Sequence, residues 1–309
     1  MTSVIIAAHD EEAVIGRCLD GLLADAAPGE FDITVVANGC TDATAEVAAR
    51  RPGVRVLELA TASKPAALNA GDAVAVGFPR VYVDADIVLT ADGLRAISAP
   101  LHPPDDPMAG GSAAGRRGVP PLAAVPRRAL DLTGRPVLVR AFFAINGRLP
   151  VYRDGLFGRG VIALSAEARG RFDQFPDLVA DDLFLDSLFA PPEKRQVDDV
   201  TALVATPRRT RDLLRRLIRV RGGNASMRAV AADDDLPARV RPATRLSWLR
   251  DVVLPRPWLA PAAVCYLGIT VTAALAARRR RGREQSWGRD ESSRQGEPLP
   301  HSRRRESNG

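Results

Sequence analysis

Four short apolar segments, separated by stretches with helical spacing, occupy the first 84 residues and limit the fold more than any other feature. These segments are Ser3–Ala8, Asp32–Ala37, Val54–Leu59 and Val81–Asp84. Each has the length of a buried strand. Helices are expected over 11–24, 42–51, 65–75 and 91–99, and Asp10 is a plausible N-cap of the first. Strands that alternate with helices at this spacing predict an α/β fold: a doubly wound, mostly parallel sheet with flanking helices.

Residues 100–135 interrupt this alternation. They contain seven prolines and five glycines, which indicates an irregular connection or flexible loop. We expect regular structure again near 137–145 and 160–164, a helix over 178–188, and a basic helix over 208–221 whose apolar side carries Leu213, Leu214, Leu217 and Ile218.

A long uncharged stretch lies near the end of the chain. Trp258–Ala277 holds twenty residues without a charge, and Arg278–Arg281 follow directly. This length, with flanking aromatic and arginine residues, is typical of a transmembrane or membrane-associated helix; a buried or surface-lying helix is the alternative. Residues 226–257 are expected to form a linker or amphipathic segment, and 278–309 a disordered basic tail.

The two ends of the chain also indicate where the protein is located. The N-terminus has no basic region followed by a long apolar run, so we expect no signal peptide and a cytosolic first domain. The arginines after residue 277 favour a cytosolic tail as well, which a single span would not allow. A helix lying in the membrane interface satisfies both demands. The expected location is therefore the cytoplasmic face of the cell membrane.

The net charge of +6 is divided unevenly along the chain. Residues 1–207 carry 20 basic and 27 acidic side chains, whereas residues 208–309 carry 23 and 10. A cation or metal site is therefore expected upstream and an anionic partner downstream. Nucleic acid is disfavoured, because aromatic residues make up only 5% of the chain. The three cysteines form no CxxC pair, which excludes a disulfide scaffold and makes a zinc ribbon unlikely to occur.

Polar clusters follow three of the predicted strands, at 9–12, 38–42 and 84–86. Ligands bind beyond the carboxyl ends of strands in open parallel sheets. In an extended segment, Asp84 and Asp86 would point to the same face and share one hard divalent cation. The alternative is that one caps a turn and the other is solvated. Lys64 could contact a phosphate or simply be solvated.

The motifs together resemble a known family. VIIAAHDEE, VVANGCTDAT, KPAALNAG and VYVDAD are similar, in order and spacing, to the nucleotide-sugar-binding half of family 2 glycosyltransferases, which have a GT-A fold. GRGVIAL at 158–164 resembles the acceptor-side glycine segment, and 175–183 the stretch with the family's acidic pair. RVRGGN at 219–224 resembles the closing basic motif. The resemblance implies a GT-A domain over 1–225, with a nucleotide-sugar-binding half at 1–99 and an acceptor half at 136–225.

The resemblance also implies roles for individual residues. Asp182 would be the catalytic base, and Asp86, with Asp84, would bind Mg²⁺ or Mn²⁺ at the donor diphosphate. The remaining substrate-binding positions would be Ala8, His9, Glu11, Glu12, Asn38, Lys64, Asp84, Gly158, Gly160, Asp181, Arg219 and Arg221. Ala37 and Asn38 stand where many members have acids, which leaves UDP and GDP both open.

The expected function is inverting, metal-dependent transfer of a sugar from a nucleotide-diphospho-sugar to a hydroxyl acceptor, lipid-linked or small, in the cell envelope. A catalytically inactive, membrane-tethered nucleotide-sugar-binding protein is the alternative. A nucleotidyltransferase is disfavoured, because no glycine-rich loop with a lysine follows the first strand.

Overall fold

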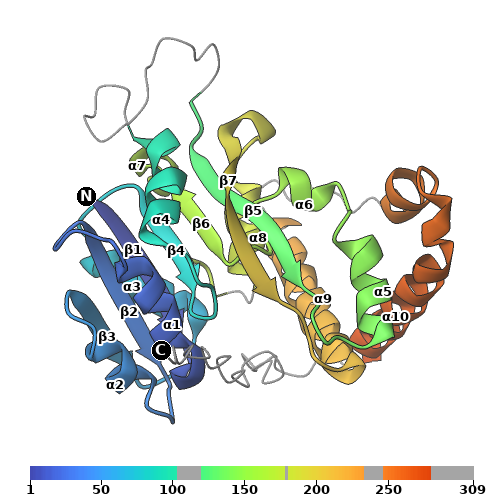
Figure 1. Ribbon diagram of the computed structural model, residues 1–309, viewed down its shortest axis with the longest axis horizontal. Helices are drawn as coiled ribbons and strands as arrows, with labels where there is room; N and C mark the ends of the chain where they lie inside the picture. Colours follow the sequence, from blue (N-terminus) through green and yellow to red (C-terminus); the bar gives the residue numbers. More distant parts are fainter. Residues whose placement is uncertain (103–119, 178–179, 233–245, 280–309) are drawn as a thin grey trace, which may run out of the picture.

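A seven-stranded mixed sheet in the order β3-β2-β1-β4-β6-β5-β7 forms the centre of the protein (Figure 1). The structure, a computed structural model, describes residues 1–102, 120–177, 180–232 and 246–279. The strands are β1 (Thr2–Ala8), β2 (Phe31–Asn38), β3 (Val54–Leu59), β4 (Arg80–Asp84), β5 (Ala123–Asp131), β6 (Val161–Leu164) and β7 (Lys194–Ala205).

The first four strands run parallel and confirm the alternation expected from the sequence. The helices between and after them are α1 (Glu12–Leu23), α2 (Thr44–Ala49), α3 (Lys64–Val74) and α4 (Ala91–Ser98), which continues into η1 (Ala99–Leu101). Ser63 and Thr90 cap α3 and α4 by accepting hydrogen bonds from backbone N–H groups of the first turn. The strands thus deliver their carboxyl ends to one edge of the sheet.

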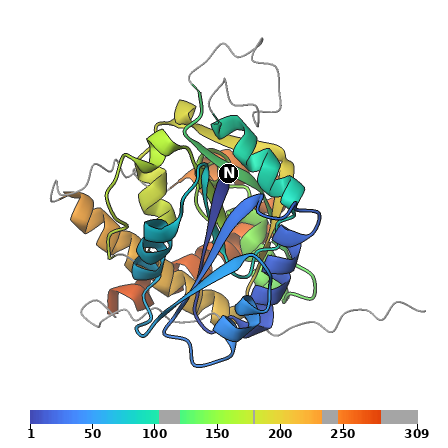
Figure 2. The ribbon, with the colours of Figure 1, turned by 90° about the vertical axis from the view of Figure 1, so that its left-hand side faces the viewer.

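Helices cover both faces of this sheet (Figure 2), and apolar side chains fill the layer between the helices and each face. On one face, side chains of α1, α2 and α4 pack against the side chains that β1, β2 and β4 direct to this face. On the other face lie α3, α7 (Ala166–Arg169) and α8 (Asp181–Ser187), with a group of edge-to-face phenylalanines that includes Phe172, Phe175 and Phe184. Both faces are buried, as a doubly wound sheet requires.

Two strands depart from the sequence prediction. β5 lies within the segment expected to be irregular, and β7 was not predicted. The register of β5 and β7 shifts between Pro126 and Arg127, because a proline cannot donate to the ladder and is accommodated at an irregularity. β7 is the last strand of the sheet, so it tolerates the charged side chains that hide its alternation.

A helical layer covers the end of the sheet beyond β5 and β7 (Figure 1). It contains α5 (Val137–Asn146), α6 (Val151–Asp154), α9 (Thr210–Ala232), η4 (Trp248–Val253), η5 (Pro257–Leu259) and α10 (Ala260–Arg279); η3 (Pro191–Glu193) precedes β7. The helix expected over 208–221 therefore continues to residue 232, beyond the expected domain end at 225. α10 packs on α5 and α9 through Ile269 and Tyr266.

Asp10 does not cap α1: it has a φ of 51°, and its carboxylate accepts hydrogen bonds from the backbone N–H groups of Thr41 and Asp42 instead. Residues 103–119, 178–179, 233–245 and 280–309 lie outside the described residues, and with them about half of the expected irregular connection, the centre of the expected linker and nearly all of the expected basic tail.

Candidate active site

A cleft of about 290 Å³ opens at the carboxyl ends of β1 and β4. It brings together nine of the residues singled out in the sequence: His9, Lys64, Asp84, Asp86, Gly158, Gly160, Asp181, Asp182 and Arg219. They come from the ends of β1 and β4, from α3, α8 and α9, and from the loop before β6. Chain segments up to 210 residues apart thus meet in one cavity whose polar lining is mainly charged.

Asp84 and Asp86 flank a tight turn at the end of β4. The backbone N–H of Ile87 donates a 3.0 Å hydrogen bond to the carbonyl of Asp84, so the segment bends directly after the strand. The expected extended geometry is therefore wrong, although both carboxylates do line the cleft. Asp84 pairs with Ala7 of β1 on one side, and its N–H donates to the Gly160 carbonyl on the other, at 2.8 Å.

Gly160 gives this turn the space it needs. Its φ is 69°, a conformation that favours glycine. A Cβ atom at this position would lie 2.5 Å from Cγ1 of Ile87 and 3.2 Å from Oδ2 of Asp84. Any side chain here would therefore push against the two residues that hold the Asp84–Asp86 turn.

Lys64, the first residue of α3, joins the two acidic sides of the cleft. Its Nζ lies 2.9 Å from Oδ1 of Asp84 and 3.0 Å from Oδ2 of Asp181. Burial lowers the pKa of Lys64, but the charges of Asp181 and Asp84 more than offset this and hold that pKa well above its usual range. The ammonium group is therefore a permanent cation that neutralises a crowded pair of carboxylates.

Asp182 lies at the start of α8, next to this network. Its Oδ2 accepts a 3.0 Å hydrogen bond from the N–H of Gly158, and its Oδ1 accepts one from the N–H of Leu183 at 2.8 Å. Burial, followed by the charge of Asp181, raises the pKa of Asp182 from 3.8 to about 6, against the opposing effects of Lys64 and the Gly158 hydrogen bond. A carboxylate with this pKa is ionised at neutral pH and still basic enough to take a proton.

Two arginines of α9 complete the cleft. Arg219 was expected there, and Arg216 was not. The two lie three residues apart and therefore share one helix face, a spacing visible in the sequence of the basic helix. Arg221 does not line the cleft. The anion-binding capacity of the cavity comes from this helix face and from Lys64.

Four expected substrate-binding residues do not line the cleft: Ala8, Glu11, Glu12 and Asn38. Asn38 is fully buried: its Nδ2 donates to the Ala8 carbonyl at 2.7 Å, and its Oδ1 accepts from the N–H of Ser63 at 2.9 Å. The backbone N–H of Glu11 donates to Thr44, and Glu12 accepts from the N–H of Ala43. The contacts of Asn38, Glu11 and Glu12 fix the loops after β1 and β2. Of the substrate-binding residues expected in these loops, His9 is the one that lines the cleft.

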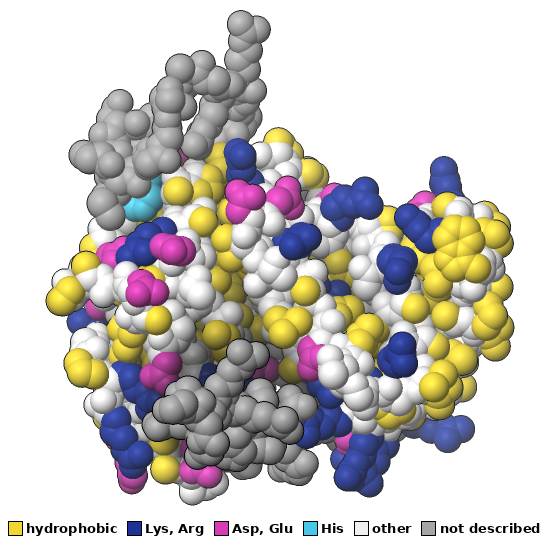
Figure 3. All heavy atoms as spheres, viewed as in Figure 1, with side chains coloured by type: hydrophobic (Ala, Val, Ile, Leu, Met, Phe, Trp, Pro, Cys, Tyr) yellow, Lys and Arg dark blue, Asp and Glu magenta, His cyan; other side chains and the backbone are white. Residues whose placement is uncertain are grey.

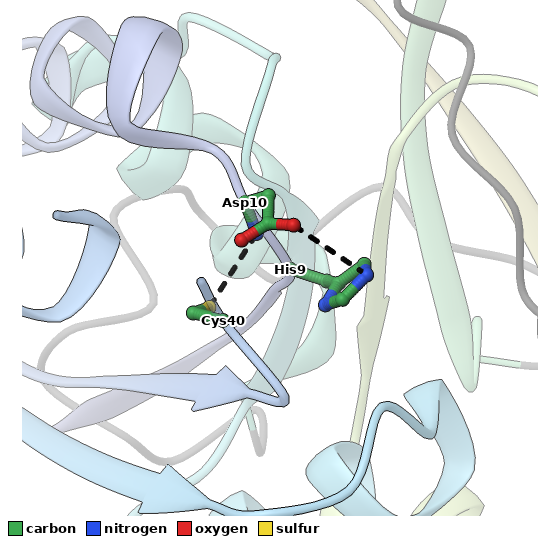
Figure 4. A group of neighbouring side chains, drawn as sticks. All are labelled: His9, Asp10 and Cys40. Carbon is green, nitrogen blue, oxygen red and sulfur yellow. Dashed lines mark hydrogen bonds and ion pairs between the residues drawn. The ribbon is translucent and has the colours of Figure 1, made fainter. Parts of the chain in front are cut away.

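His9, Asp10 and Cys40 form a separate cluster (Figure 4), whose possible metal-binding atoms lie within 4.8 Å of one another. The Asp10 carboxylate already accepts hydrogen bonds from Thr41 and Asp42. Burial raises the pKa of the Cys40 thiol, which opposes the thiolate form that a metal binds. The cluster thus suits hydrogen bonding between the β1 and β2 loops better than metal binding.

The Asp84–Asp86 turn fits a hard divalent cation better. Its donors are carboxylate oxygens, the ligands preferred by Mg²⁺ and Mn²⁺. Both residues line the open cleft, and the Asp84 side chain is 45% exposed. Asp84 and Asp86 are therefore residues of the described cleft lining whose carboxylates could hold such an ion.

Comparison with known proteins agrees with this geometry. Residues 3–147 match the model of "Glycosyl transferase family 2". No curated protein matches the chain. Among solved structures, it is similar to a mannosyltransferase from Pyrobaculum calidifontis, solved with GDP-Man and Mn²⁺, at 20% identity and a TM-score of 0.55, covering 90% of this chain and 78% of that one.

Two further structures are more distant. Residues 1–349 of TarS from S. aureus align at 16% identity and a TM-score of 0.49, covering 88% of this chain and 80% of the other. Glucosyl-3-phosphoglycerate synthase from Mycobacterium tuberculosis aligns at 18% identity and a TM-score of 0.48, covering 69% and 73%.

The sheet order, the covered faces and the first of these structures agree on the GT-A fold expected from the sequence. The family match spans the parallel strands, the Asp84–Asp86 turn and Lys64, which are the donor side of the cleft. The protein therefore contains a glycosyltransferase family 2 domain over residues 3–147.

Proposed function

We propose that the protein transfers a sugar from a nucleotide-diphospho-sugar to a hydroxyl group with inversion at the anomeric carbon. The position of Asp182 carries this proposal. It lines the same cleft as the Asp84–Asp86 turn, but it comes from α8 and not from the end of β4. A base on one side and a diphosphate-binding group on the other is the arrangement that a direct displacement needs.

In this mechanism, Asp182 takes the proton of the acceptor hydroxyl as its oxygen attacks the anomeric carbon. The bond from that carbon to the diphosphate breaks, and its electrons leave with the nucleoside diphosphate. Lys64 offsets part of the charge of Asp84 and Asp181, the two carboxylates that raise the pKa of Asp182. Arg216 and Arg219 supply positive charge for the leaving group. A divalent cation at Asp86 and Asp84 would neutralise further charge on the diphosphate.

Support for a metal-dependent donor site comes from the chemistry of the Asp84–Asp86 turn. The P. calidifontis mannosyltransferase, which shares the fold, was solved with GDP-Man and Mn²⁺. We propose Mg²⁺ or Mn²⁺ as the cofactor of this chain as well. UDP- and GDP-sugars are both compatible with His9 as the residue from the β1 loop that reaches the cleft.

We further propose that the enzyme works at a membrane surface. Pro257–Arg279 is long and apolar enough to cross a membrane, with a mean hydropathy of 1.8 over its most apolar window. α10 buries Ala263, Ile269 and Ala273 against the protein and exposes Val264 and Leu267. A helix held by the protein on one face suits a position in the membrane interface. The three free thiols suit the cytoplasmic side.

The test is a panel of UDP- and GDP-sugars, assayed for binding and for transfer or slow hydrolysis with Mn²⁺, Mg²⁺ or a chelator. We expect one donor to bind with a divalent cation and to turn over in the wild type, and Asp182→Asn to bind it equally but turn it over at least about 100-fold more slowly. Asp173→Asn, an exposed site nearby, is the control. Tight donor binding without turnover in the wild type would favour an inactive nucleotide-sugar-binding protein.

A further inference from the structure

A second cavity, which we call the arginine groove, lies among β5, α5, α6 and η4 and has a volume of about 1380 Å³. Its described lining contains eight arginines and one carboxylate, that of Asp251. Six of the arginines are Arg128, Arg140, Arg148, Arg153, Arg250 and Arg256. Figure 3 shows basic side chains gathered over this part of the molecule. Such an excess of one sign favours an anionic ligand.

Arg128 has hydrogen-bond donors that nothing in the described structure uses. Its guanidinium stacks on Tyr152, with 4.1 Å from Cζ to the ring centroid. Its Nε and Nη1 are buried and have no hydrogen-bond partner among the described residues. Burial, and then the charge of Arg216, lower the pKa of Arg128. Buried unpaired donors on a cation are costly, and a bound anion would remove that cost.

Arg159, in the wall of the same groove, shows what a structural arginine looks like here. It is 1% exposed and donates to the carbonyls of Pro126 and Gly155 and to Oε1 of Gln196. Its guanidinium is fully occupied in fixing the segment between α6 and β6. Arg128, which stacks on Tyr152 and keeps two donors unpaired among the described residues, is the one whose guanidinium is available to the oxygens of a phosphate or carboxylate.

Gly158, which lines the cleft, lies next to Arg128 of the arginine groove. A Cβ atom at Gly158 would lie 4.0 Å from Nε of Arg128, and the N–H of the same glycine holds Asp182. One residue therefore separates the unpaired guanidinium from the proposed base. We infer that the acceptor carries a phosphate group, which binds in the arginine groove at Arg128 while the acceptor hydroxyl reaches Asp182. The inference rests on the proposed function, because it names the acceptor class of that same site.

Two sources could supply this phosphate. Arg250 and Arg256 lie on the side of the groove next to η5, where Trp258 is 72% exposed, so a lipid-borne phosphate has an apolar surface beside it. A soluble phosphorylated acceptor would use the same arginines without that surface. The shared chemistry is a phosphate monoester or diester, and the experiment distinguishes the two carriers.

The first arm measures inorganic phosphate binding to the full-length protein by calorimetry. We expect saturable binding that weakens by roughly tenfold or more in Arg128→Gln and in the double variant Arg140→Gln/Arg250→Gln. The double variant changes exposed side chains, so it guards against a folding defect at Arg128. Arg50→Gln, an exposed arginine on the α2 side, is the matched control and should bind like the wild type. Phosphate affinity equal to that of the wild type in both groove variants, or no phosphate binding in the wild type, would overturn the inference.

The second arm uses dodecyl phosphate in phosphatidylcholine vesicles. A lipid carrier predicts much tighter binding than that of inorganic phosphate and the same dependence on Arg128, whereas a soluble carrier predicts equal affinities. Donor binding, measured on the same variants, should stay unchanged. If the proposed function is wrong, the wild type will show no donor binding or no turnover. The phosphate measurements do not depend on that outcome.

Discussion

The backbone N–H of Gly158 donates a 3.0 Å hydrogen bond to Oδ2 of Asp182. Gly158 has a φ of 71°, so the loop presents this N–H in a conformation that a glycine adopts readily. The bond lowers the pKa of Asp182, while burial and Asp181 raise it to about 6. The loop that borders the arginine groove thus also adjusts the basicity of the proposed catalytic group.

The first prediction concerns the pH dependence of transfer. A base must be ionised, so kcat should fall as the pH drops through about 6, where Asp182 gains a proton. Replacing Asp181 by Asn removes a like charge that raises the pKa, so the acidic limb of the profile should move to lower pH. A profile that is flat from pH 5 to 8 would contradict the assignment of Asp182.

Lys64→Gln should move the same limb in the opposite direction. Lys64 lowers the pKa of Asp182, so its removal raises that pKa and shifts the limb to higher pH. Loss of the ammonium also leaves Asp84 and Asp181 without their shared partner. We expect a loss of about 1–2 kcal/mol of unfolding free energy, between the values for exposed and buried ion pairs, measured by chemical denaturation. An unchanged limb would show that Lys64 does not act on the base.

Gly160→Ala should harm both stability and donor binding. Its Cβ would lie 2.5 Å from Ile87 and 3.2 Å from Oδ2 of Asp84, at a positive φ. Gly134→Ala is the matched control, because Gly134 has a φ of 65° and nothing within 4 Å of the new atom. The control should lose about 1 kcal/mol, from backbone strain alone, and Gly160→Ala should lose more. Equal losses in thermal unfolding, with intact donor binding, would count against a tight turn at Asp84.

Asp86→Ala should remove the cation-dependent part of donor binding. Asp86 offers a carboxylate at the cleft, and its loss should weaken Mn²⁺-supported donor affinity by more than about tenfold. Calorimetry with and without a chelator separates this from cation-independent binding. Asp92→Ala, an exposed carboxylate on α4, is the control. If the chelator has no effect on the wild type, a metal at Asp86 is excluded.

Membrane attachment should depend on the outward face of α10. Val264 and Val271 are 74% and 46% exposed, so Val264→Ser/Val271→Ser should leave the fold intact and reduce flotation with anionic vesicles. Val76→Ser/Leu203→Ser changes two exposed apolar residues elsewhere and should float like the wild type. Equal flotation of both double variants would place the attachment outside this face.

The parallel half of the protein was predictable because β1, β2 and β4 are mostly buried and have apolar centres, while β3 alternates apolar and charged residues. The Asp84–Asp86 pair and Asp182 were found from local motifs, although the tight turn at Asp84 was not. β5 was missed because Pro126 and two arginines interrupt its apolar residues, a pattern that fits a strand only beside the irregularity with β7. The arginine groove depends on tertiary contacts between β5, α6 and η4, which no local pattern records.

β6 runs antiparallel to β4, and this reversal has a consequence for how such an enzyme can diversify. Because of this reversal, the first residues of β6 lie beside the last residues of β4. At this point the hydrogen bond from the N–H of Asp84 to the carbonyl of Gly160 joins the proposed donor and acceptor sides. The segment from 147 to 155 precedes that contact, between α5 and β6, and lines the arginine groove and not the cleft. Its length and composition can change without moving the donor cleft, so new acceptors can be selected while the donor stays the same.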